Sequence, residues 1–461
     1  MAGDRGYVEC IKVNREFQPN HYREILNLAL PVGLEAVFQA SFSLIDQIVV
    51  GSLGATAVAA VGLSNNLSFI LTLLYAAIGT GSGAFIAQAF GRRDMDEVSK
   101  IAALGQTAAA ILGICSALPL VLFPNPILRS LGAQEELVNT GSLYLQLFAA
   151  SAPLTVMSAV TTAAFRSMSD TRTPMVITIG SVCLNTLLAL VLVLGVGGFP
   201  KLGVAGAGIA TLISQGLRAV VLVTVLYSAK SGIRWHWPIR STIREIGPPL
   251  FKTTYPIALS EMLWGTSAFV YVVIFTRIST EALAASQVVT MVENLFIVAA
   301  SGLAPAAVAT VGQSLGANAK GNARKQARRV LYAAIVAGLL FTVALSCVSL
   351  LLPILYPRVN RPVLNLAFWG LMIAAAVQPA KVINNVLGIG ILPSGGDTKF
   401  VLCSHIVSSY AVCLPLAASM TLLLRWGALS AFGSRALEEL LKSGILLARY
   451  RTRAWQKKLR T

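Results

Sequence analysis

Apolar residues in this chain fall into long runs that are bounded by charged residues, glycine or proline. Most runs are about 20 to 30 residues long, which is enough for an α-helix to cross a bilayer. They cover roughly residues 25–50, 56–88, 101–123, 141–165, 173–197, 203–227, 248–276, 282–313, 329–356, 362–392, 400–425 and 427–448. Because strands of a membrane β-barrel would alternate apolar and polar residues, the pattern predicts an all-α membrane protein with twelve transmembrane helices. The twelfth run is the weakest, because charged residues crowd it: Arg435, Glu438, Glu439 and Lys442.

The composition excludes most soluble classes. Of 461 residues, 56% are hydrophobic and only 12% are charged, against about 25% charged in ordinary soluble domains. So few charges could not cover the surface of a soluble enzyme, a nucleic-acid-binding protein or a disordered scaffold. A multi-span helical membrane protein is therefore the expectation.

The positions of lysine and arginine predict the orientation in the membrane. With twelve spans both ends lie on one side, and that side carries 26 of the 36 basic residues, against six on the other. Since basic loops stay in the cytoplasm, we expect both termini there, in a multi-pass inner or plasma membrane protein. This asymmetry accounts for the net charge of +17 without a nucleic-acid partner.

The two halves of the chain repeat. An offset of 225 residues aligns several pairs without a gap: Pro31 with Pro256, Leu34 with Leu259, Gln88 with Gln313, Gly91 with Gly316 and Gly113 with Gly338. Six spans in each half give both repeats the same orientation. We therefore expect two six-helix lobes related by a pseudo-two-fold axis along the membrane normal, as in transporters that work by alternating access. The expected segments are an N-terminal cytoplasmic tail (1–24), an N-lobe (25–227), a linker (228–247), a C-lobe (248–448) and a basic tail (449–461).

Several motifs, in order and in duplicate, resemble the multidrug and toxic compound extrusion (MATE) family, and within it the bacterial DinF-like branch. They are LIDQIVVGSLGATAVAAVGLS from residue 44, AQAFGRRD at 87–94 with its repeat VGQSLGAN at 311–318, FRSMSDTRTPM at 165–175 with its repeat GILPSGGDTKF at 390–400, and GVAGAGIATLISQ at 203–215. The resemblance covers about residues 20–455. It implies a secondary active antiporter that exports amphipathic, often cationic compounds.

Polar residues on the first predicted helix form one stripe. Glu35, Gln39 and Asp46 are spaced by four and seven residues, so the two acids share a helix face about 16 Å apart along the axis. A carboxyl at mid-membrane costs about 2.5–3.5 kcal/mol on insertion scales, so each one needs a partner, a proton or a function. We expect the stripe to face the bundle interior or a hydrated cavity.

The resemblance implies that Asp46 binds the coupling cation, with help from Asn185 and, at a hydroxyl position sometimes included in the site, Thr211. Relatives often have a second acid where this chain has Ala189. Hard cations need several oxygen ligands, so the missing acid favours H⁺ over Na⁺, although Glu35 could substitute for it. A structural role in hydrogen bonding between helices is the alternative for all four residues.

In the second half, Glu261 matches the neighbourhood of a functional glutamate in the family's seventh span, and Trp264 lies one turn later. Lys381 lies in the tenth span and is expected to pair with either Glu261 or Glu293. Tyr271 is the repeat position of Asp46, so the lobes are chemically unequal. These residues, together with Gln39, form the candidate substrate or second coupling site.

The sequence suggests no enzyme. It contains no phosphate-binding Gly-x-x-x-x-Gly-Lys-Ser/Thr loop and no His-Glu-x-x-His helix, so we expect no cofactor and no metal. The partners expected are amphipathic small molecules and the bilayer, with a monomeric chain. Two alternatives stay open, namely a flippase for a lipid-linked sugar and a membrane interaction protein that transports nothing.

Overall fold

A computed structural model describes residues 21–229 and 231–459, nearly all of them helical and none of them in a strand. The chain divides into two compact units. The first contains Leu34–Phe251, and the second contains Tyr22–Gly33 and the residues from Lys252 onward. Two long helices therefore contribute to both units: α2 (His21–Gly51) and α10 (Arg240–Ile278).

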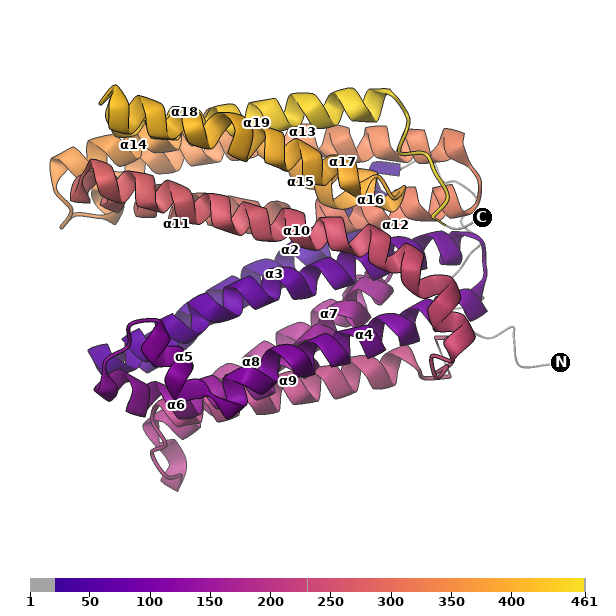
Figure 1. Cartoon of the computed structure of the whole chain (residues 1–461), viewed down its shortest axis with the longest axis horizontal. Helices are drawn as coiled ribbons and strands as arrows, with labels where there is room; N and C mark the ends of the chain where they lie inside the picture. The colour runs from indigo at the N-terminus through magenta and orange to yellow at the C-terminus, as the bar shows by residue number, and fades with distance from the viewer. Residues whose placement is uncertain (1–20, 230, 460–461) are drawn as a thin grey trace. The chain divides into compact units, whose positions relative to one another are not determined.

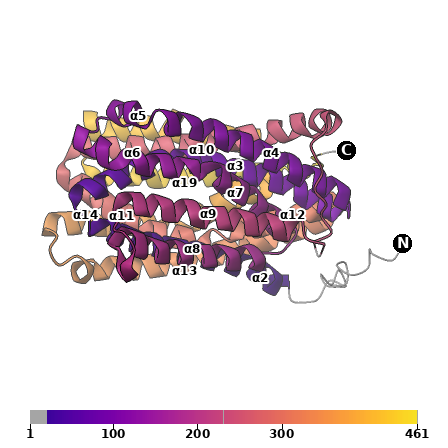
Figure 2. The ribbon, with the colours of Figure 1, turned by 90° about the horizontal axis from the view of Figure 1, so that it is seen from below.

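Within the first unit, α3 and α4 pack against α7, and α9 packs against α6 and α8. Figures 1 and 2 show α8 and α9 running side by side. The helices of this unit are α3 (Ala55–Gly91), α4 (Met95–Leu122), α5 (Pro124–Ser130), α6 (Glu135–Ala150), α7 (Ala152–Ser167), α8 (Arg172–Leu194), the short 3₁₀ turn η1 (Val196–Gly198) and α9 (Val204–Leu226).

Within the second unit, several stretches contain π-helical turns, labelled η2 to η4. The elements are α11 (Thr280–Ala300), α12 (Leu303–Gly316), α13 (Lys320–Leu355), α14 (Arg361–Ala376), α15 (Gln378–Asn385), η2 (Val386–Ile391), α16 (Leu392–Ser394), α17 (Thr398–His405), η3 (Ile406–Cys413), α18 (Leu414–Ala418), η4 (Ser419–Leu423) and α19 (Ala428–Arg451). The axis bends by 53° between α14 and the stretch 378–394, where Pro379 begins the new helix.

Ten helices among the described residues are long and apolar enough to cross a membrane, or eleven if the bent pair 361–376 and 378–394 is one span. Each of the twelve predicted runs corresponds to one helix or to consecutive helices in the structure, which confirms the all-α prediction. The run at 427–448 forms α19, a helix outside the ten because of the charges that made it the weakest prediction.

Two of the expected boundaries differ from the helix bounds. The stretch 228–247, expected to be a linker, contains the start of α10 at Arg240, and α19 extends to Arg451, inside the expected basic tail. The expected N-terminal tail 1–24 lies outside the described residues except for its last four, which begin α2.

The internal repeat is visible in local geometry. Gly113 on α4 lies directly against the backbone of Pro153, and its counterpart Gly338 on α13 lies in the same way against Pro379. Neither position has room for a Cβ atom, so both glycines permit a close helix approach.

The loops of the repeat share their backbone conformations as well. Arg93 and Asn318, which are 225 residues apart, both adopt the left-handed conformation, with φ of 62° and 59°. Ser169 and Gly396, which are 227 residues apart, do the same, with φ of 69° and 76°. Non-glycine residues rarely adopt this region, so its recurrence at matched positions supports the repeat predicted from the sequence.

The C-terminal segment packs back onto the second unit. Trp455 is fully buried, its ring stacks on Tyr450 at 5.7 Å between centroids, and its Nε1 donates to the Tyr450 carbonyl at 3.0 Å. Arg449 donates to both carboxylate oxygens of Asp397, at 2.6 and 3.1 Å. This ion pair joins the end of α19 to Asp397, which directly precedes α17.

Candidate functional site

The first unit encloses a polar cavity of about 290 Å³. Residues from α2, α3, α6, α8 and α9 line it, and among them are four residues singled out from the sequence: Gln39, Asp46, Asn185 and Thr211. The helical spacing that placed Gln39 and Asp46 on one face of α2 therefore directs both toward this cavity.

Asp46 is held by neutral donors. The Thr186 hydroxyl donates to its Oδ1 at 3.0 Å, and in the amide orientation that satisfies its neighbours Asn185 donates to Oδ2 at 2.9 Å. In that orientation the Asn185 oxygen faces the Thr211 amide at 3.2 Å and the Ser214 hydroxyl at 3.0 Å. Among the described residues, no basic side chain lies within 4.0 Å of the Asp46 carboxylate. Such a carboxylate can take up a proton or a small cation without first breaking an ion pair.

Glu35 has a different environment. Its side chain is 1% exposed, and its Oε2 accepts a hydrogen bond from Arg166 Nη2 at 2.8 Å. Oε1 accepts from Gln39 Nε2 at 3.3 Å and lies 4.0 Å from Arg218 Nη2. Glu35 is therefore a buried ion-pair partner and, unlike Asp46, does not line the cavity.

Arg166 lies in the last turn of α7, and Asp170 follows that helix closely. In the structure it reaches Glu35, whereas Asp170 accepts a hydrogen bond from the Thr173 amide at 3.0 Å, at the start of α8. Asp170 thus satisfies a backbone amide in the first turn of α8, which is a structural role.

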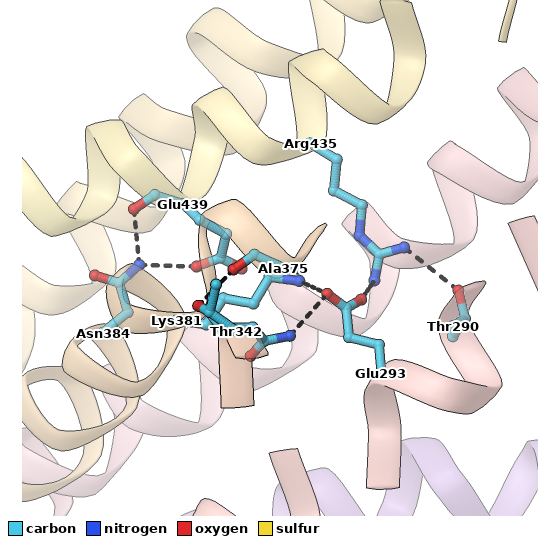
Figure 3. A network of polar contacts seen from close by, with 9 residues as sticks. Thr290, Glu293, Thr342, Ala375, Lys381, Asn384, Arg435 and Glu439 are labelled. Atoms are coloured by element: carbon cyan, nitrogen blue, oxygen red, sulfur yellow. Dashed lines mark hydrogen bonds and ion pairs between the residues drawn. The ribbon is translucent and has the colours of Figure 1, made fainter. Parts of the chain in front are cut away.

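In the second unit, Glu293 is the centre of an ion-pair cluster, drawn in Figure 3. Its side chain is 1% exposed and is paired with Lys381 through Oε1, while Arg435 Nη2 lies 3.4 Å from Oε2. Arg435 also donates to Thr290 at 3.4 Å. Of the two partners predicted for Lys381, the structure selects Glu293 rather than Glu261.

Charged residues that made the twelfth run look weak are paired inside the second unit. Besides Arg435 with Glu293, Asn384 donates to Glu439 Oε2 at 2.8 Å, and Ser409 donates to Glu438 Oε1 at 2.5 Å. The polar face of α19 is therefore turned to partners on neighbouring helices, which removes most of the cost of placing it in the unit.

A second cavity, of about 200 Å³, lies in the second unit. Glu261, Trp264 and Lys381 line it, and Glu261 makes no ion pair within 4.0 Å among the described residues. Lys442 and His405 also line it, with 3.0 Å between Lys442 Nζ and His405 Nδ1.

Three other candidates for the second site do not line this cavity: Gln39 lines the first cavity, Glu293 is held by Lys381 and Arg435, and Tyr271 lies in the core. Tyr271 is buried in an apolar cluster with Phe275 and Leu371 and does not line the second cavity. Its ring packs in this cluster, and its hydroxyl interacts with Ser434 and Glu438 on α19, so the repeat position of Asp46 holds a buried polar group of another kind.

Sequence reasoning missed several polar residues around Asp46. Thr186 follows Asn185 directly, and Ser181 precedes it by four residues, one helical turn away on the same face. Ser214 follows Thr211 by three residues. A search for polar residues one helical turn from Asn185 and Thr211 would have found Ser181 and Ser214, whereas the spacing gives no signal for Thr186.

The fold and the two cavities, one in each unit, define a multi-span, all-helical membrane protein of the kind that carries solutes. The MatE family model matches residues 31–191 and 256–419, so the chain belongs to the MatE family, whose members are membrane transporters and not enzymes. This confirms the resemblance seen in the sequence.

Relatives and solved structures agree with that assignment. The chain is 25% identical over 460 residues to the probable multidrug resistance protein NorM of Thermotoga maritima, covering 96% of this chain and 95% of that protein. It is 28% identical over 314 residues to the probable multidrug resistance protein YoeA of Bacillus subtilis, covering 67% and 68%. In fold it is similar to a crystal structure of a mutant of the Vibrio cholerae MATE transporter VcmN, with a TM-score of 0.87, 19% identity and coverage of 95% and 98%.

Proposed function

We propose that this protein exports amphipathic, often cationic small molecules across the inner or plasma membrane by antiport against inward-moving protons. Two relatives carry the name multidrug resistance protein, which supports the substrate class. The single observation that carries the coupling role is that Asp46 faces a cavity, accepts hydrogen bonds from Thr186 and Asn185, and has no cationic partner among the described residues within 4.0 Å.

The hydrogen bonds of Asp46 suggest how a proton would be sensed. Both donors to the carboxylate, Thr186 and Asn185, belong to α8, while Asp46 belongs to α2. Protonation adds an O–H donor to one carboxylate oxygen and makes that oxygen a weaker acceptor, so the contact on that oxygen weakens or rearranges. Proton binding would thus change the contact between α2 and α8. Coupling requires that the proton bind one conformation of the protein more tightly than another, and a contact that differs between conformations would meet this requirement.

Protons fit this site better than sodium ions. A Na⁺ ion would need several oxygen ligands, and Ala189 lines the cavity where relatives often have a second acid. Glu35 cannot supply that ligand without leaving Arg166, at 2.8 Å. We therefore assign Asp46, Asn185 and Thr211 to coupling and give Glu35 a positioning role on α2.

The second cavity is proposed as a substrate or second coupling site. Glu261 and Trp264 line it, and an acid beside an aromatic ring suits a cationic, partly apolar compound. Lys381, although it lines the same cavity, is bound to Glu293 and is proposed to hold the helices in place.

The available driving force is sufficient for export. A membrane potential of 100 mV supplies about 2.3 kcal/mol for each net positive charge that enters per cycle, which corresponds to a concentration ratio of roughly 50. Exchange of one proton for one monovalent cation moves no net charge and draws on the pH gradient alone, so the membrane potential contributes when two protons enter for each cation exported.

The test uses the full chain in proteoliposomes with ethidium as the substrate. A pH gradient and a Na⁺ gradient are imposed separately. We expect ethidium movement driven by the pH gradient and none driven by Na⁺ alone. Movement driven only by Na⁺ would overturn the proton assignment, and translocation of a lipid-linked sugar without ethidium movement would favour the flippase.

A further inference from the structure

In the interior of the first unit, two guanidinium groups lie beside a single carboxylate. Arg166 and Arg218 share one carboxylate, that of Glu35, and their side chains are only 22% and 15% exposed. Arg166 lies 2.8 Å from the carboxylate, whereas Arg218 lies 4.0 Å away. Glu35 is thus neutralised mainly by Arg166, and the positive charge of Arg218 is only weakly compensated.

Arg218 lines the same cavity as Asp46. Its Nε is buried and has no hydrogen-bond partner, and neither has the buried Oε1 of Gln215, which lines the cavity from the preceding turn of α9. Buried polar groups are almost always satisfied, and an unmade hydrogen bond costs about 1–3 kcal/mol. Unpaired polar groups beside a cavity therefore point to a ligand with matching groups.

We propose that Arg218 forms an oxyanion subsite that binds a carboxylate or phosphate group of the substrate. The planar guanidinium matches such groups through two parallel hydrogen bonds, which a solvated ammonium cannot do. Gln215 Oε1, an acceptor, would take a hydroxyl or N–H hydrogen of the same molecule.

The position of Asp46 in the same cavity extends the proposal. Among the described residues that line this cavity, Asp46 has the acidic side chain and Arg218 has the basic one. A molecule with a cationic and an anionic group can therefore meet a charge of opposite sign at each. The inference rests on the proposed function in one respect, namely that the protein transports amphipathic compounds, and it adds that the first cavity, besides its coupling role, binds the acidic group of such a compound at Arg218.

The experiment compares two dyes that differ in one group, rhodamine B with its free carboxylate and the ethyl ester of rhodamine B. Equilibrium binding to the purified full chain in nanodiscs is measured by fluorescence polarisation, without any ion gradient. In Arg218→Gln we expect the affinity for rhodamine B to fall by about 10-fold or more, whereas the affinity for the ester changes by less than about twofold. Arg218→Lys keeps the charge and should retain part of the preference.

Removal of Arg218 leaves Glu35 paired with Arg166, so Arg218→Gln is expected to fold. The unchanged affinity for the ester verifies that fold in the same assay. An equal loss of both dyes, or of neither, would overturn the subsite. Competition by benzoate or by phenyl phosphate then identifies which oxyanion the subsite prefers. Because no gradient is used, a failure of proton coupling in proteoliposomes would leave this result unaffected, so the two proposals fail separately.

Discussion

The carboxylate of Asp46 on α2 accepts a hydrogen bond of 3.0 Å from the hydroxyl of Thr186 on α8. Three helical turns earlier on the same face of α2, Glu35 is instead held by Arg166 at 2.8 Å. Two acids that look equivalent in the sequence thus have different partners. This difference is the basis for proposing that Asp46 exchanges a proton while Glu35 stays in its ion pair.

Neutralising Glu293 should destabilise the second unit. Glu293→Gln leaves Lys381, which is 9% exposed, and Arg435 without their carboxylate. Breaking a buried pair in this way costs about 3–5 kcal/mol. Lys381→Met alone should cost less, because Arg435 still compensates Glu293. Thermal unfolding in detergent measures both effects, with the double variant Glu293→Gln/Lys381→Met expected to recover part of the loss. A Glu293→Gln protein as stable as the wild type would show that the cluster contributes little.

Adding a methyl group to either repeat glycine should also destabilise the fold. A Cβ atom at Gly113 or Gly338 would meet the backbone of Pro153 or Pro379. We expect Gly113→Ala and Gly338→Ala each to cost about 1–3 kcal/mol, since the helices must separate. Gly180→Ala is the matched control, because no atom lies within 4 Å of the added group. Comparable stability of all three variants would show that the close approach is unnecessary.

Trp455 should keep the C-terminal segment bound. Its side chain is 0% exposed, so Trp455→Ala removes packing worth about 3–5 kcal/mol, while Trp455→Phe keeps a ring against Tyr450. Limited trypsin digestion of the purified chain measures cleavage after Arg451 and Arg453. We expect much faster cleavage in the alanine variant than in the phenylalanine variant or the wild type. Equal cleavage rates in all three proteins would show that burial of Trp455 does not protect the C-terminal segment from trypsin.

The charge asymmetry predicts where the C-terminus lies. A green fluorescent protein fused after Thr461 should fluoresce, because it folds in the cytoplasm, and an alkaline phosphatase fused at the same position should be inactive there. The opposite pattern would place the C-terminus outside the cell. It would contradict the orientation predicted from the 26 basic residues assigned to the cytoplasmic side.

The helices could be predicted because the bilayer leaves few alternatives. Backbone groups in hydrocarbon must pair within one helix, so each solid apolar run has to be helical. The repeat was also visible, since Gly113 and Gly338 are conspicuous in the two aligned halves and proved to make the same contact. The π-helical turns and the 53° bend were not predicted, because both arise from packing and from the local position of Pro379.

The pairing of the charges was only partly predictable. Spacing put Glu35 and Asp46 on one face, but it could not show that Arg166, 131 residues later, reaches only the first of them. For Lys381 the sequence left two partners open, since the choice of Glu293 depends on which faces of α11 and α15 meet. Asn185 came from the family resemblance, and its contact with Asp46 requires the fold of the first unit.

The central claim is that Asp46 carries the coupling proton. Its most direct test is ethidium transport by Asp46→Asn in proteoliposomes under an imposed pH gradient, beside Glu35→Gln and the wild type. We predict that Asp46→Asn folds but shows no ethidium transport driven by the gradient. Transport by Asp46→Asn that follows the pH gradient as in the wild type would contradict the account.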